Sequence, residues 1–97
     1  MPADRLRTAD VDRLAAAFAS LGDPDEVYAF LQDVATVREI QEMAQRLEVA
    51  RMLSDGEHYD RIREATGASS TTISRVSRCL NYGSDGYKTV LERLREA

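Results

Sequence analysis

Residues 58–82, HYDRIREATGASSTTISRVSRCLNY, decide the fold of this chain, because they encode two short helices joined by a tight turn. Gly67 lies where the first of these helices must end and where the backbone needs a positive φ, which glycine adopts without steric cost. Ser69 and Ser70 follow as candidate N-caps of the second helix. The stretch therefore predicts a steep corner of two helices around a glycine turn.

The second helix of this corner has two different faces. Ile73, Val76 and Leu80 recur at helical spacing and form a narrow apolar stripe, whereas the rest of the surface is polar and rich in small hydroxyl groups. Such side chains let a helix enter the major groove of DNA, with its first turn near base edges and phosphates. The candidate DNA-contacting residues are Arg61, Arg63, Ser70, Thr71, Thr72, Ser74, Arg75 and Arg78. We expect the Ser and Thr residues to face the groove, and Arg61, Arg63 and Arg78 to hold phosphates.

Charge is unevenly distributed along the 97 residues, whose formal net charge is −4. Residues 1–57 hold six arginines against twelve acids, a balance of −6, whereas residues 58–97 hold six arginines and one lysine against five acids, a balance of +2. No acid occurs between Glu64 and Asp85. The positive part coincides with the corner, as a nucleic-acid footprint requires, although an excess this small also arises by chance.

The rest of the chain also follows helical periodicity, and no stretch predicts a strand. Thr8 and the Asp23-Pro24 pair are helix-start signals, and a longer helix follows Thr36. The residues expected to face inward on that longer helix are Val37, Ile40, Met43, Ala44, Leu47, Ala50 and Leu53, and those on the last helix are Tyr87, Val90, Leu91 and Leu94. We therefore predict one all-α domain over 1–97, with six helices. Its parts are a helical dimerisation region at about 8–55, the helix-turn-helix at about 58–81 and a C-terminal helix at about 86–96.

Apolar side chains in the N-terminal half predict association with a second copy. Phe18, Tyr28, Phe30 and Leu31 would leave an exposed patch on a monomer, and such patches mark association surfaces. A two-fold homodimer covers the same patch on both copies. It also sets the second helices of the two corners roughly 34 Å apart, so that they face successive major grooves of DNA.

Several classes of protein are excluded by composition. Cys79 and His58 are the sole cysteine and histidine, so we expect no intrachain disulfide, no cysteine-cluster zinc site and no catalytic residues. The chain has no membrane-spanning run and no signal-peptide core, which predicts a cytoplasmic protein without a membrane partner.

A different class of function remains open on these grounds. The chain could be a helical protein-interaction module in which the corner is purely structural and the acidic N-terminal half binds a basic partner. Such a module shows no salt-sensitive binding to duplex DNA, which separates it from a DNA-binding regulator.

Three segments carry a resemblance to a known family: VREIQEMAQRLEVARMLSDGE at 37–57, GASSTTISRVSRCLNYG at 67–83 and DGYKTVLERL at 85–94. The chain resembles the tryptophan-repressor superfamily over roughly residues 10–95, and its SRV, RCLNYG and DGY runs are similar to those of the YerC/YecD-like branch. The resemblance implies a six-helix, intertwined homodimer in which each helix-turn-helix reads half of an operator in double-stranded DNA. We therefore predict a sequence-specific transcriptional regulator that acts as a repressor and, because the residues offer no nucleophile–base arrangement, not an enzyme.

The resemblance further implies a site for a small-molecule co-repressor. In the tryptophan-binding members, the ligand lies between two arginines and a threonine whose positions correspond to Arg46, Arg75 and Thr72. This chain departs from that pattern at Val76, which replaces a small glycine and would crowd a flat ring. The identity of any effector therefore stays open. So does the alternative in which Arg46 pairs with Glu42 or Glu39 and Arg75 meets a phosphate.

Overall fold

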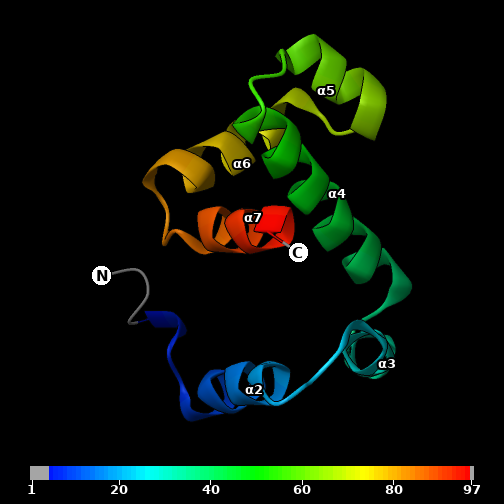
Figure 1. Ribbon diagram of the computed structural model, residues 1–97, viewed down its shortest axis with the longest axis vertical. Coiled ribbons are helices and arrows are strands. Elements are labelled where there is room, and N and C mark those ends of the chain that lie inside the picture. Colours follow the sequence, from blue (N-terminus) through cyan, green and yellow to red (C-terminus); the bar gives the residue numbers. More distant parts are fainter. Residues whose placement is uncertain (1–4, 97) are drawn as a thin grey trace. The chain divides into compact units, whose positions relative to one another are not determined.

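The computed structural model describes residues 5–96, and helices dominate this part of the chain. In order they are α2 (Ala9–Ala19), α3 (Pro24–Val34), α4 (Val37–Ser54), α5 (Tyr59–Thr66), α6 (Ser70–Tyr82) and α7 (Gly86–Glu96), as Figure 1 shows. No strand occurs among the described residues, and the all-α prediction is confirmed. The chain divides into two compact units, one up to Val37 and one from Arg38. None of the helices in the described part is long and apolar enough to cross a membrane.

Local capping explains where α2 and α3 begin. Thr8 Oγ1 accepts a hydrogen bond from Val11 N at 3.2 Å, and Asp23 Oδ1 accepts one from Glu26 N at 2.9 Å. Pro24 is the first residue of α3, where its missing N–H is not needed. The Glu26 carboxylate accepts from the backbone N of residue 22 at 2.6 Å, one residue earlier than in a standard capping box. Both helix starts predicted from the sequence are confirmed.

The first unit contains apolar helix faces but no core of its own. The rings of Phe18 on α2 and Phe30 on α3 meet edge to face, with centroids 5.1 Å apart. No residue of α2 or α3 is buried, and large apolar side chains such as Leu14 (41% exposed) and Tyr28 (67% exposed) face solvent. The hydrophobic effect leaves such surface unfavourably hydrated unless a partner covers it.

The long helix α4 is buried only near its C-terminal end. Val49, Ala50 and Met52 are buried, whereas Val37 is 71% exposed and Met43 is 41% exposed. The sequence prediction placed both exposed residues inward and omitted Val49 and Met52. The difference arises because only the C-terminal part of α4 joins the core with residues of α5, α6 and α7, and periodicity does not show which part of an apolar stripe meets a core. Hydrogen bonds from Gly56 N to Leu53 O and from residue 57 N to Met52 O, both 3.0 Å, close the helix in a Schellman motif.

The second unit has one contiguous hydrophobic core. It joins the end of α4 to α5, α6 and α7, and α5 packs on α6 as α6 does on α7. The core residues are Val49, Ala50, Met52, Ile62, Ala68, Ile73, Val76, Leu80 and Leu91. On α7 the predicted stripe is only partly inward, because Leu91 is 5% exposed but Leu94 is 58% exposed. The core therefore holds the α5–α6 corner against α4 and α7.

Charged groups connect α7 to the end of α4. Arg95 Nη2 donates to Asp55 Oδ1 and to Ser54 Oγ, each at 3.0 Å. Arg51 Nη1 donates to the other Asp55 oxygen at 3.2 Å. Arg51 also donates to Glu48, and this hydrogen bond is the main cause that raises the pKa of the Arg51 guanidinium above its ordinary value. Asp55 is thus shared by Arg51 and Arg95.

Candidate nucleic-acid interface

The α5–α6 corner is closed by hydrogen bonds between neighbouring residues. Gly67 follows α5 with φ at 74°, in the left-handed region, and its N–H donates to Arg63 O at 2.9 Å. The Thr66 hydroxyl donates to Ile62 O at 2.7 Å and accepts from Ala68 N at 3.1 Å. The predicted positive φ at Gly67 is confirmed. A β carbon there would meet nothing within 4 Å, so the backbone conformation alone favours glycine.

Hydrogen bonds order the start of α6 and the end of α5 that precedes it. Ser69 Oγ accepts from Thr72 N at 3.1 Å, and the Ser69 hydroxyl donates to Thr72 Oγ1 at 3.1 Å. Gln45 on α4 donates from Nε2 to Thr66 O at 3.1 Å and so satisfies a carbonyl group at the end of α5. The cap thus fixes the first turn of α6, and the Gln45 bond ties the end of α5 to α4.

Burial divides α6 into an inner and an outer side. Ile73, Val76 and Leu80 are buried, as the sequence predicted. Because a helix turns by roughly 100° per residue, positions 70, 71, 74, 75 and 78 lie on the side opposite these three residues. The polar side of α6 therefore faces solvent because its apolar stripe is held in the core.

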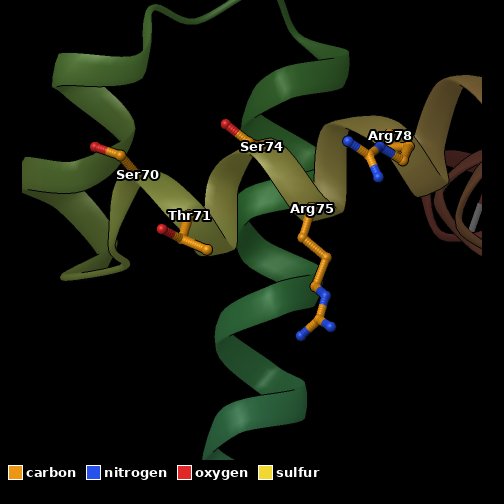
Figure 2. A pocket seen from close by; sticks show the side chains of 5 residues that line it. All are labelled: Ser70, Thr71, Ser74, Arg75 and Arg78. Atoms are coloured by element: carbon orange, nitrogen blue, oxygen red, sulfur yellow. The ribbon is translucent and has the colours of Figure 1, made fainter.

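The outer side of α6 carries an open groove with a volume of about 520 Å³. Its lining residues are Ser70, Thr71, Ser74, Arg75 and Arg78, all exposed and all drawn in Figure 2. The structure thus brings together five of the eight residues that the sequence suggested for DNA contact. The hydroxyl groups occupy the first half of the helix, and the guanidinium groups follow.

The arginines of the corner differ in their partners. Arg61 Nε on α5 lies 3.6 Å from Glu57 Oε2, and Arg63 Nη1 donates to Ser70 Oγ at 3.2 Å. Arg75 and Arg78 form no ion pair with any residue that the structure describes. No ion pair therefore has to be broken before these two guanidinium groups bind an anion such as a DNA phosphate.

The suggested small-ligand residues are not gathered in this groove. Arg75 lines it, but Arg46 and Thr72 do not, and both are half-buried. Within residues 5–96, Arg46 forms no hydrogen bond or ion pair, whereas Thr72 is engaged by Ser69. No cluster of three metal-binding side chains occurs among the described residues, and Cys79 is an exposed free thiol.

One exposed residue of α6, Tyr82, is not among the residues predicted from the sequence to contact DNA. Tyr82 ends the helix with 88% of its surface exposed. It follows Arg78 by four residues, as Arg78 follows Ser74, so these residues share one side of the helix. This regular spacing was available in the sequence, but the helix-turn-helix was predicted to end at about residue 81, just before Tyr82.

Comparisons with known proteins agree with this architecture. The family model described as Trp repressor protein matches residues 9–95. The uncharacterized protein YerC of Bacillus subtilis (strain 168) is 52% identical over 96 residues, which cover 99% of this chain and 92% of that protein.

Two solved structures share the fold. A TrpR-like protein from Eubacterium eligens ATCC 27750 superposes with a TM-score of 0.88 at 53% identity, covering 94% of each chain. A putative Trp repressor from Staphylococcus aureus superposes with a TM-score of 0.91 at 43% identity, covering 98% of this chain and 95% of that chain. The resemblance read from the sequence is confirmed, and the chain belongs to the Trp repressor protein family, in its YerC-like branch.

Proposed function

We propose that this protein is a dimeric, sequence-specific regulator of transcription that binds double-stranded DNA through α6 and acts as a repressor. The observation that carries the proposal is the outer side of α6, where three hydroxyl and two guanidinium groups line one open groove. Membership of the Trp repressor protein family supports the same function.

The order of side chains along α6 supports different roles for its hydroxyl groups and its guanidinium groups. Ser70, Thr71 and Ser74 are short, so the helix backbone can approach base edges closely enough for their hydroxyl groups to form hydrogen bonds. Arg75 and Arg78 carry unpaired charges and reach the phosphate backbone, where they release counterions. Arg61 and Arg63, on α5, add phosphate contacts beside the groove. Arg63 also positions the first turn of α6 through its hydrogen bond to Ser70.

A second copy is needed for selective binding. The exposed apolar faces of α2 and α3 give the chain a surface that a two-fold partner covers. Two copies of α6 then read two half-sites in successive major grooves, which doubles the number of base contacts. Arg46, Thr72 and Arg75 stay the proposed location of a small-molecule effector, whose identity is open.

In vitro selection of bound duplexes tests this function directly. We expect enrichment of a pseudo-palindromic sequence whose half-sites are about one helical turn apart, and affinity that falls steeply with salt. A parallel selection with a pool of amino acids and metabolites reports any effector. Absence of both enrichment and salt-sensitive binding would contradict the proposal and favour a protein-interaction module.

A further inference from the structure

Tyr82 is an exposed aromatic residue at the point where α6 ends. Its side chain is 88% exposed and forms no hydrogen bond within residues 5–96. The helix stops immediately afterwards, because the backbone of Gly83 leaves the helical region, with φ at −89° and ψ at −148°. Nothing in the second unit's core uses this ring, so packing gives no reason for a tyrosine at this position.

The position of Tyr82 continues the proposed DNA-binding side of α6. Ser70, Ser74, Arg78 and Tyr82 are spaced by four residues and therefore form one ridge along the helix. Tyr82 stands at the C-terminal end of this ridge, beyond the five residues that line the groove. The ring is thus continuous with the candidate nucleic-acid interface.

The length of α6 decides which part of the DNA Tyr82 can reach. Tyr82 follows Ser70 by twelve residues, which corresponds to roughly 18 Å along the helix axis. The major groove is only about 12 Å wide, and a reading helix places its N-terminal residues at the base edges. The C-terminal end of α6 then lies over the sugar–phosphate backbone at the edge of the groove.

The chemistry of a tyrosine suits that location. A phenolic hydroxyl donates a hydrogen bond to a phosphate oxygen without bringing a charge, and tyrosine is among the side chains that contact DNA phosphates. The acid that follows along the chain, Asp85, has Lys88 Nζ 3.9 Å from its Oδ1, which reduces its repulsion of a nearby phosphate. No other acid occurs between Glu64 and Tyr82.

We infer that Tyr82 is a further DNA-binding residue, whose hydroxyl donates to a backbone phosphate and fixes the C-terminal end of α6 on the duplex. This inference rests on the proposed function, since it assumes that α6 lies in the major groove. The proposed contact of Tyr82 differs from those proposed for Arg75 and Arg78 in one measurable respect. A neutral donor releases no counterion, so it strengthens binding without changing the dependence of affinity on salt.

The test compares Tyr82→Phe with the wild-type protein on two fluorescent duplexes, one obtained by selection and one of unrelated sequence, across a salt series. We expect the affinity of Tyr82→Phe for DNA to fall about tenfold for each α6 helix that contacts the duplex. The fall should be the same on both duplexes. The slope of log affinity against log salt should stay that of the wild type. Arg78→Ala, in contrast, should flatten this slope by about one.

Thr89→Val is the control, because it removes the hydroxyl of an exposed residue on α7 that does not line the groove. Its affinity should equal that of the wild type, and all three variants should unfold at the wild-type temperature. Unchanged binding by Tyr82→Phe, a loss confined to the selected duplex, or a flatter salt slope would each overturn the inference while leaving the proposed function in place. A wild-type protein that binds neither duplex would overturn both.

Discussion

Thr71 and Arg78 lie on the same exposed side of α6, as Figure 2 shows. Because one is a hydroxyl and the other a guanidinium, we expect their truncation to weaken DNA binding in different ways. Thr71→Ala removes a hydroxyl and a methyl group from the first turn, where the helix approaches base edges. We expect binding to the selected duplex to weaken by about 1–3 kcal/mol, with little change on unrelated duplexes. Equilibrium titration by fluorescence anisotropy measures both.

Thr89→Ala provides the control for that experiment, because Thr89 is an exposed threonine on α7, away from the groove lining. It should bind as the wild type does. If Thr71→Ala weakened binding equally on every duplex, Thr71 would contact the sugar–phosphate backbone of the DNA. The assignment of base contacts to the first turn of α6 would then be wrong.

A buried residue on the same helix tests the core beneath the interface. Ile73 is fully buried, so Ile73→Ala removes apolar contacts and leaves a cavity that costs about 2–5 kcal/mol in the free energy of unfolding. Cys79→Ala, on an exposed part of α6, should change it by less than about 0.5 kcal/mol. Urea denaturation measures both values, and an equal effect of the two substitutions would contradict the orientation of α6.

At the scale of elements, helix boundaries were readable from the sequence because they are determined locally. The caps at Thr8, Asp23 and Ser69, and the left-handed turn at Gly67, depend on groups within a few residues of one another. The inner and outer sides of α6 were also readable, since its apolar stripe is narrow and regular.

Burial was harder to predict where it depends on what surrounds a helix. Met43 and Leu94 both belong to regular apolar stripes but are exposed, whereas Val49 and Met52 are buried outside the predicted stripe. Periodicity reports which side of a helix is apolar, but it does not report how many neighbours enclose it. The same reason explains why Tyr82 was missed, because its exposure depends on where the chain turns after α6.

The end of α6 depends on one glycine for steric reasons. A β carbon at Gly83 would lie 2.3 Å from Cys79 O, which is a backbone atom and cannot move as a flexible side chain does. We expect Gly83→Ala to lower the free energy of unfolding by about 1–3 kcal/mol and to displace Tyr82. Gly86→Ala is the control, since a β carbon there meets nothing within 4 Å. Thermal unfolding followed by circular dichroism compares the two, and equal stability would refute the steric argument.

At the scale of the whole molecule, the two units differ in how their apolar surface is covered. The second unit buries nine hydrophobic residues in a core, whereas α2 and α3 bury none. The free energy of hydrating exposed apolar surface opposes a stable monomer with this arrangement. We therefore expect the protein to sediment as a dimer at micromolar concentration, with a thermal midpoint that rises with protein concentration.

Leu14→Glu tests which surface forms that dimer. Leu14 is 41% exposed on the apolar side of α2, and glutamate is a good helix former, so the substitution places a charge in the interface without weakening the helix itself. Ala16→Glu adds the same charge on the opposite side of α2 and should remain dimeric. Sedimentation equilibrium should find Leu14→Glu monomeric, and its affinity for a two-half-site duplex should fall much more than its affinity for a single half-site. A dimeric Leu14→Glu variant with normal DNA binding would show that copies associate through another surface, and a monomeric wild type would show that one α6 acts alone.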